Sequence, residues 1–244
     1  MRTYSLADVH ATRKRKDAWW TVLAVDPLAC PLTRIIASRT RLTPNQITVF
    51  SLILGMAAAG CFAADRLIAG AILFYLSFLV DCVDGKIARL KGTGTPFGLW
   101  LDYVGDRLRV VACAAGLSYG QYALTGEVMF VVMGAAVAVL DLFRYVNAPQ
   151  MKRVREELPE GTRAAKGRWA RRLARRRMRS HLFSGIEFHA AVFVAAPLLA
   201  VAAGSGVVLV WMTVVAGALL LGYEVHLVYR LWIFTRQAAI QRGV

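Results

Sequence analysis

Acidic residues are scarce in this sequence of 244 residues, which has 15 aspartates and glutamates against 30 lysines and arginines. Cysteine and histidine are rarer still, with four of each. No two cysteines are close enough to form a CxxC pair, and the histidines have no metal-ligand spacing. These absences argue against a zinc site and a disulfide framework. We expect the cysteines to be small apolar packing residues, namely Cys30, Cys61, Cys82 and Cys113.

The sequence also has no internal repeat, no apolar leader before a cleavage site and no room for a second soluble domain. Long apolar runs dominate instead: 57% of the residues are hydrophobic, and the mean hydropathy is +0.50. A membrane-spanning helix needs about 20 mostly apolar residues. The sequence therefore predicts an all-α, polytopic membrane protein with six transmembrane helices, at 46–64, 67–86, 101–124, 127–146, 186–203 and 207–228.

The positive charges predict the orientation of these helices. The connections at 65–66, 125–127 and 204–206 hold a single basic residue, Arg66. All other lysines and arginines lie in, or at helix ends facing, the remaining connections and the two termini. Because positive residues favour the cytoplasmic side, both termini and the segment that joins the second and third helices are predicted to be cytoplasmic.

The sequence divides into two regions. Residues 1–42 form an N-terminal cytoplasmic segment, in which Leu28, Leu32, Ile35 and Ile36 share one helical face, as expected of an amphipathic helix at the membrane interface. Residues 43–244 form the membrane domain, and Thr43 and Pro44 are the predicted N-cap and first residue of its first helix.

A long connection, about 147–185, carries 12 basic residues between Met151 and Ser180. The first interpretation is a solvated cytoplasmic loop that enforces topology and contacts anionic lipid. Recruitment of an anionic substrate to a nearby site is a second interpretation. Nucleic-acid binding is disfavoured, because no recognition motif accompanies the charge.

Four aspartates stand at the predicted cytoplasmic ends of the second and third spans. Asp81 and Asp84 are three residues apart, and Asp102 and Asp106 are four apart, so each pair lies on one helix face. A hairpin of the two helices brings the four carboxylates together, which is unfavourable unless positive charge lies among them. Intramembrane acids are functional by default, although helix-end surface charges balanced by nearby basic residues are the alternative.

Carboxylate ligands favour hard cations such as Mg²⁺, Mn²⁺ or Ca²⁺ over zinc. Four carboxylates are enough for two such ions, an arrangement suited to displacement at phosphorus. A carboxylate beside the ions could take the proton of an attacking hydroxyl. No serine, cysteine or histidine in the segment has a paired base that would make it a nucleophile. Direct transfer is therefore favoured over a covalent enzyme intermediate.

The segment from Asp81 to Asp106 resembles the signature of a known family. The pattern Asp81-x2-Asp84-Gly85-x2-Ala88-Arg89-x8-Gly98-x3-Asp102-x3-Asp106 is similar, without a departure, to the signature of the CDP-alcohol phosphotransferases. The TPNQIT sequence at Thr43–Thr48 and the six-helix plan after an interfacial helix also resemble this family. The likeness covers about residues 28–228, and its specific part is the segment 81–106.

The resemblance implies transfer of a phosphoalcohol from a CDP-alcohol to a second alcohol, with release of CMP. It also implies a homodimer. Two divalent cations, Mg²⁺ or Mn²⁺, would be bound by Asp81, Asp84, Asp102 and Asp106, with Asp106 also acting as general base. The CDP moiety would be bound by Asn45, Gly85, Ala88, Arg89 and Gly98.

The substrates are less specified. CDP-diacylglycerol is the expected donor because most relatives use it, while a water-soluble CDP-alcohol donor or a diacylglycerol acceptor are the alternatives. A phosphate-bearing acceptor is weakly indicated by basic residues expected to face the site, namely Arg109, Arg144, Lys152 and Arg153. Glu187 is expected to cap a helix or face the acceptor, and Glu224 to make a polar contact between helices.

A divalent cation transporter is the competing function, since intramembrane acids also mark ion pathways. Against it, the acids cluster at one membrane face, and no partner acids continue a path through the outer halves of the helices. An inactive scaffold of the family is disfavoured because every residue of the signature is intact.

Overall fold

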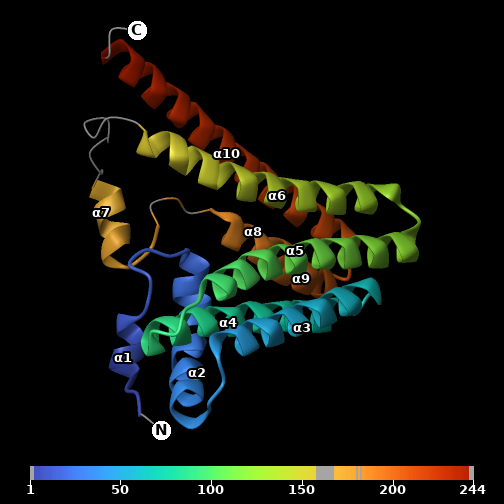
Figure 1. Cartoon of the computed structure of the whole chain (residues 1–244). Coiled ribbons are helices and arrows are strands. Elements are labelled where there is room, and N and C mark those ends of the chain that lie inside the picture. Colours follow the sequence, from blue (N-terminus) through green and yellow to red (C-terminus); the bar gives the residue numbers. More distant parts are fainter. Residues whose placement is uncertain (1–2, 158–167, 180, 182, 242–244) are drawn as a thin grey trace.

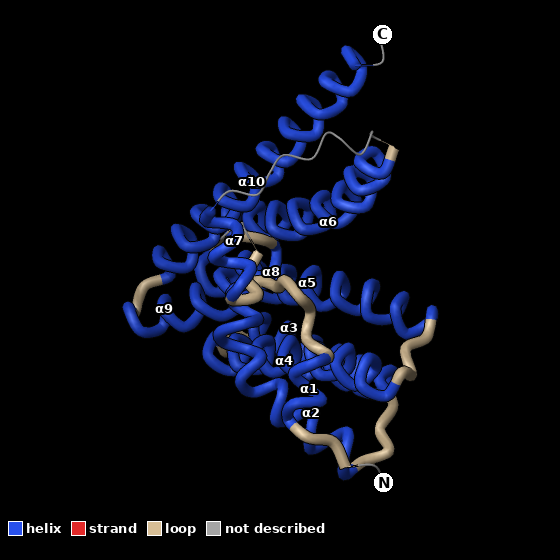
Figure 2. The backbone as a smooth tube through the Cα atoms, turned by 90° about the vertical axis from the view of Figure 1, so that its left-hand side faces the viewer, coloured by secondary structure: helices blue, strands red, loops and turns tan. Residues whose placement is uncertain are grey.

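The computed structural model describes residues 3–157, 168–179, 181 and 183–241, with side chains described for all of these except 168–171 and 239–241 (Figure 1). Within these residues the regular structure is helical, and the helices are joined by short loops (Figure 2). The elements, including two π-helical segments, are α1 (Leu6–Ala11), η1 (Thr21–Val25), α2 (Asp26–Arg39), α3 (Pro44–Ala63), α4 (Leu67–Lys91), α5 (Pro96–Thr125), α6 (Val128–Glu156), α7 (Arg168–Arg175), α8 (Gly185–Ala190), η3 (Ala191–Ala195), α9 (Ala196–Ala203) and α10 (Gly206–Gln241).

Six of the described segments are long and apolar enough to cross a membrane. Five of them contain predicted spans, and the sixth is Thr21–Arg39. The predicted third span, α5, is missing from this set because Asp102, Asp106, Arg107 and Arg109 make its first half polar. Yet α5 packs between α3 and α6 and runs beside them (Figure 1). We therefore keep α5 in the bundle.

Helix α2 takes a different direction from the bundle. Figure 1 shows it crossing the ends of α3, α4 and α5 rather than running along them, and it packs against α4. Leu28 and Ile35 are exposed on it, whereas Leu32 and Ile36 pack against the buried cluster around Val83 and Ile87. Helix α2 thus exposes apolar side chains while it crosses the ends of the bundle helices, which fits the expected position at the membrane interface.

Local sequence determines how the bundle helices begin. Thr43 accepts a hydrogen bond from the Gln46 amide at 3.3 Å, and the Gln46 side chain accepts one from the Thr43 amide at 2.9 Å. This capping box, with Pro44 at the first helical position, confirms the predicted start of α3. Thr95 caps α5 in a similar way through the Gly98 amide at 3.0 Å. Helix α5 therefore begins five residues before the predicted span.

Two prolines coincide with local widening of a helix. Thr21–Val25 and Ala191–Ala195 are π-helical turns, and each is followed within two residues by proline, Pro27 and Pro197. Proline lacks an amide hydrogen and its ring clashes with the carbonyl four residues earlier, so the turn before it opens. Segments α8, η3 and α9 therefore form one span, Gly185–Ala203.

The predicted loop at 147–185 is shorter than expected. Helix α6 continues to Glu156, so residues 147–156 are helical, and α7 occupies part of the remainder. Residues 158–167, 180 and 182 lie outside the described part. The last helix likewise extends from the predicted 228 to Gln241. In Figures 1 and 2 its C-terminal end reaches beyond the rest of the bundle.

Helices α3 and α5 approach closely through glycine. A Cβ atom at Gly116 would collide with the Ala59 carbonyl, and one at Gly120 would collide with the Phe62 carbonyl. Beside this contact, Phe62 and Phe193 belong to the larger buried cluster that joins α3 to the fifth span. The close approach positions the Asp-bearing end of α5 against α3 and α4.

We expect Gly120→Val to destabilise this contact. The added methyl groups have no space against the Phe62 carbonyl, and overpacking of this kind costs about 1–3 kcal/mol. Gly60→Val in α3 is the matched control, because a Cβ there meets no atom within 4 Å. Thermal unfolding in detergent measures both variants. An unchanged transition for Gly120→Val would show that the glycine contact is not tight.

Candidate active site

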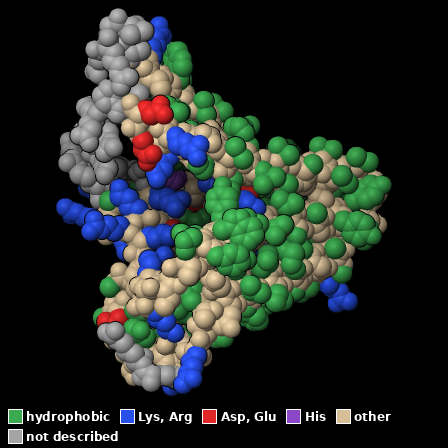
Figure 3. Space-filling model, viewed as in Figure 1, with side chains coloured by type: hydrophobic (Ala, Val, Ile, Leu, Met, Phe, Trp, Pro, Cys, Tyr) green, Lys and Arg blue, Asp and Glu red, His purple; other side chains and the backbone are tan. Residues whose placement is uncertain are grey.

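A cavity of about 730 Å³ opens where the N-terminal segment, α3, α4 and α5 meet. In Figure 3 basic side chains surround a hollow on the left half of the molecule, while hydrophobic side chains cover the right half. All eight residues of the family-like pattern line this cavity, as does Asn45. The structure therefore brings the predicted metal ligands and the predicted nucleotide contacts into one space.

Three of the four aspartates form a tight group. Asp81 from α4 and Asp102 and Asp106 from α5 each offer a carboxylate oxygen, and these atoms lie within 4.8 Å of one another. Helical spacing sets this arrangement, because Asp102 and Asp106 are one turn apart on α5, and α3 packs against both α4 and α5. Such a set of oxygen donors fits a hard divalent cation.

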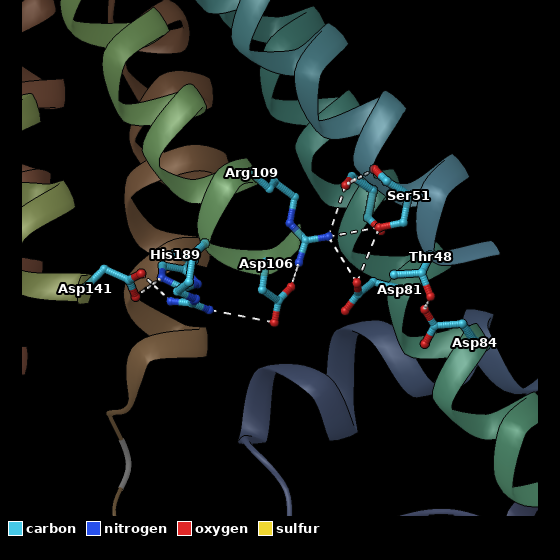
Figure 4. Close-up of polar contacts among 10 residues, drawn as sticks. Thr48, Ser51, Asp81, Asp84, Asp106, Arg109, Asp141 and His189 are labelled. Atoms are coloured by element: carbon cyan, nitrogen blue, oxygen red, sulfur yellow. Dashed lines mark hydrogen bonds and ion pairs between the residues drawn. The ribbon is translucent and has the colours of Figure 1, made fainter. Parts of the chain in front are cut away.

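Asp84 takes a separate partner. Its carboxylate accepts a hydrogen bond from the Thr48 hydroxyl of α3, and the side chain is buried in the cavity wall (Figure 4). It is not a member of the group formed by Asp81, Asp102 and Asp106. Because Thr48 engages Oδ2, Asp84 would reach a shared ligand through its other oxygen or after leaving Thr48.

A resident cation lies among the carboxylates, which the sequence interpretation did not assign. Arg109, predicted to contact the acceptor, is 3% exposed and forms ion pairs with Asp106 and, at 3.4 Å, with Asp81 (Figure 4). Its guanidinium also donates to the Ser51 and Ser77 hydroxyls at 3.0 and 3.2 Å. Arg109 therefore offsets the repulsion between these aspartates, and it is held deep in the wall behind them.

Glycine makes room for this arginine. A Cβ at Gly55 in α3 would lie 2.7 Å from the Arg109 Cγ atom. Substitution of Gly55 would therefore displace the Arg109 stem and, with it, the partner of Asp81 and Asp106.

The predicted nucleotide contacts are also neighbours. A Cβ at Gly98 would lie 2.6 Å from the Asn45 Oδ1 atom, so the start of α5 meets the start of α3 through glycine. A Cβ at Gly85 would lie 3.3 Å from Arg89 Nη1. Arg89 in turn donates to the Thr12 carbonyl at 2.7 Å. The two glycines therefore let the Asn45 and Arg89 side chains lie close to the backbones of α5 and α4 at the cavity.

The predicted acceptor residues are separated by the structure. Arg144 lines the cavity, and a Cβ at Gly185 would collide with its guanidinium. Lys152 and Arg153 are exposed and do not line the cavity, and Lys152 pairs with Glu156 at 3.6 Å. The structure does not bring these two residues to the cavity, because α6 stays helical beyond Arg144 and continues to Glu156.

The segment after α7 supplies two basic residues that sequence reasoning placed in a solvated loop. Arg177 and Arg179 line the cavity. The Asp17 amide donates to the Arg177 carbonyl at 2.8 Å, and the Arg179 amide donates to the Asp17 carbonyl at 2.9 Å. Arg177 also pairs with Asp26 at 3.0 Å. The end of the basic connection is thus fastened to the N-terminal segment at the cavity.

Three further residues were missed, and they form a buried polar chain. His189 of α8 contacts Asp141 of α6, and Asp141 pairs with Arg107 of α5 (Figure 4). The other two acids have structural contacts. Glu187 caps α8 through the Ser184 amide at 3.0 Å, and Glu224 accepts a hydrogen bond from Asn147 across α10 and α6 at 3.3 Å.

The family model described as CDP-alcohol phosphatidyltransferase matches residues 41–219. The chain belongs to this family. An archaetidylinositol phosphate synthase of Methanothermobacter thermautotrophicus is 36% identical over 93 residues, which is 37% of this chain and 48% of that protein. The chain spans about half or less of the length of the first curated relatives it matches.

Solved structures share the fold. Phosphatidylinositol phosphate synthase of Mycobacterium tuberculosis with CDP-DAG bound has a TM-score of 0.61 and 21% identity, covering 84% of this chain and 94% of that one. The same enzyme in complex with manganese and citrate has a TM-score of 0.52 and 22% identity, covering 84% and 89%. At this identity the likeness establishes the arrangement of the helices.

Proposed function

We propose that this CDP-alcohol phosphatidyltransferase family member cleaves the pyrophosphate of a CDP-alcohol at the cytoplasmic membrane surface. It transfers the phosphoalcohol to the hydroxyl of a second alcohol and releases CMP, as a step of phospholipid synthesis. The grouping of Asp81, Asp102 and Asp106 within 4.8 Å carries this proposal, because it joins the family pattern to a cavity large enough for a nucleotide.

The donor that fits best is CDP-diacylglycerol. The cavity lies where the polar ends of α4 and α5 meet their apolar spans, so a nucleotide can lie in water while acyl chains remain in lipid. The solved relative with CDP-DAG bound supports this choice. Asn45, Gly85, Ala88, Arg89 and Gly98 are the proposed contacts of the CDP moiety.

The donor set fits divalent cations, and the relative that binds manganese supports the same chemistry. Two ions, Mg²⁺ or Mn²⁺, would be held by Asp81, Asp102, Asp106 and Asp84, the last after release from Thr48. Bound there, they would neutralise phosphate oxygens and stabilise the CMP leaving group. The protein's own part is to orient the donor against Asn45, Gly85 and Gly98 and to accept the acceptor's hydroxyl proton on Asp106.

Further basic residues of the cavity favour an acceptor that carries a phosphate. Arg144, Arg177 and Arg179 line the same cavity, and guanidinium groups match phosphate oxygens in charge and geometry. The names of two curated relatives, archaetidylinositol phosphate synthase and phosphatidylinositol phosphate synthase, agree with such an acceptor. Arg109 and the exposed Lys152 and Arg153 are no longer part of this proposal.

We expect Arg179→Gln to raise KM for a phosphorylated acceptor by about tenfold, equivalent to the loss of one charge-assisted contact. The KM for CDP-diacylglycerol should change little. Arg153→Gln is the matched control, because this exposed arginine lies outside the cavity. Steady-state kinetics with glycerol phosphate and inositol phosphate measure the effect. Equal KM values in both variants would remove Arg179 from the acceptor site.

The proposed reaction is tested by incubating the purified protein with CDP-diacylglycerol, Mg²⁺ or Mn²⁺ and single acceptors: glycerol phosphate, inositol, inositol phosphate or serine. Release of CMP with formation of a new phospholipid is expected. Soluble CDP-alcohols test the alternative donor in the same assay. If no donor yields CMP and divalent cations instead cross proteoliposome membranes, the transporter is the better description.

A further inference from the structure

We propose that Asp141 and His189 are positioning residues for Asp106 and act through Arg107. This inference rests on the proposed function, because it concerns how the general base of that reaction is held. Neither Asp141 nor His189 belongs to the family-like pattern, and both come from helices outside the hairpin that carries it.

Asp141 is a carboxylate with no exposure to solvent, in a helix that is apolar enough to cross a membrane. Its two oxygens have different partners: Oδ1 lies 2.8 Å from His189 Nε2, and Oδ2 accepts from Arg107 Nη1. A buried carboxylate is costly unless it is fully paired. The side chain of Asp141 is therefore fixed by α8 on one side and presents its charge to α5 on the other.

Arg107 connects Asp141 to Asp106, because its guanidinium lies near both carboxylates. Its Nη2 atom lies 3.7 Å from Asp106 Oδ2, and its guanidinium carbon lies 3.8 Å from the centroid of the Tyr145 ring. Neighbouring residues on a helix do not face each other, so Arg107 reaches Asp106 only because its guanidinium is held sideways between α5 and α6. Asp141 and Tyr145 hold it there.

The carboxylate of Asp106 is thus held between two guanidinium groups. Arg109 pairs with Oδ1 (Figure 4), and Arg107 lies at Oδ2. Arg109 keeps its place without Asp141, because Ser51, Ser77 and Asp81 also bind it. Arg107 has its close ion pair with Asp141 alone among the described contacts. The orientation of the Asp106 carboxylate therefore depends on a chain that runs from α8 through α6 to α5.

Two roles of Asp141 and His189 can be distinguished: they could only pack the helices together, or they could position Asp106. Loss of packing lowers stability and the amount of folded protein, but it leaves the turnover number of folded molecules unchanged. Positioning lowers kcat while KM for the donor stays near its value, because neither Asp141 nor Arg107 is among the proposed contacts of the nucleotide. Misplacement of a reacting group by about 1 Å can reduce turnover by about 10²-fold.

A double-mutant cycle separates these outcomes. We compare Asp141→Asn, Arg107→Gln and the double variant by kcat per folded molecule, with CDP-diacylglycerol and the best acceptor. Each single variant should lose about 10–100-fold in kcat, and the double variant should be no slower than the slower single one, because both break the same chain. Gln121→Leu is the matched control, since it removes a hydrogen bond from the far end of α5 to Asp65, in the connection between α3 and α4, at 2.7 Å.

A second pair of variants covers the case in which Asp141→Asn does not fold. His189→Gln keeps a hydrogen-bond donor for Asp141, whereas His189→Leu removes it at similar volume, so the first should retain most of the turnover and the second should lose it. Additive losses in the cycle, or equal kcat in both His189 variants, would overturn the positioning role. An unsubstituted protein that releases no CMP would instead overturn the proposed function, and this inference with it.

Discussion

Asp106→Asn should reduce turnover by at least about 10³-fold, which is within the range expected for loss of a general base. The amide cannot accept the proton of the attacking hydroxyl. It also offers a weaker ligand beside Asp81 and Asp102, whose carboxylates lie within 4.8 Å of it. Donor binding should persist, because Gly98 and its neighbour Asn45 lie about two helical turns from Asp106. CMP release and equilibrium binding of CDP-diacylglycerol measure the two effects separately.

Asp65→Asn is the control for this experiment. It makes the same chemical change in the short connection between α3 and α4, at the opposite end of the bundle, where Asp65 accepts from Gln121. Asparagine also tolerates the positive φ of 54° at this position. Substantial turnover in Asp106→Asn would remove this residue as the base, while loss of activity in both variants would indicate a folding defect.

The second large effect concerns the cations. Chelation by EDTA should abolish CMP release, and Mg²⁺ or Mn²⁺ should restore it, because the grouped ligands are carboxylate oxygens. Asp81→Asn and Asp102→Asn should raise the cation concentration needed for half-maximal activity. The assay is a titration of each variant with Mn²⁺ after chelator treatment.

The identity of the cation that restores activity decides whether the ligand assignment holds. Zinc prefers nitrogen and sulfur ligands, and Cys82 is the only cysteine that lines the cavity among the described residues. Restoration by Zn²⁺ alone, or full activity in excess EDTA, would contradict the assignment of the aspartates as ligands for hard cations.

Much of the site could be predicted from the sequence because it obeys helical spacing. Asp102 and Asp106 share a face of α5, and the turn before Thr95 sets that face against Asp81 in α4. The cap at Thr43 follows from local hydrogen bonding and agrees with the prediction, whereas the cap at Thr95 was not predicted and starts α5 five residues earlier than expected. Short-range rules therefore define the hairpin that carries the acids.

Residues distant in sequence could not be placed in this way. Asp141 and His189 are 48 positions apart, and no spacing rule joins α6 to α8. Arg177 and Arg179 are hidden among 12 basic residues between Met151 and Ser180, and only the contacts with Asp17 and Asp26 distinguish them. Conversely, Lys152 has the charge of a site residue but lies beyond the cavity on a helix longer than expected.

The electrostatic argument also needed one correction. The sequence indicated that crowded carboxylates need positive charge among them, and the favoured interpretation assigned that role to bound divalent cations rather than to nearby basic residues. Arg109 already offsets part of the repulsion, as it pairs with Asp81 and Asp106 from a buried position that Gly55 makes possible. Divalent cations are thus proposed for the chemistry of phosphate displacement, and the stability of the apo site does not depend on them alone.

The most direct test of the whole account is anomalous X-ray diffraction from crystals of the full chain grown with CDP-diacylglycerol and Mn²⁺. We predict manganese peaks in coordination distance of Asp81, Asp102 and Asp106, with Asp84 turned from Thr48 toward the ions and the donor pyrophosphate beside them. Manganese bound elsewhere, with these carboxylates free of both ion and nucleotide, would contradict the account.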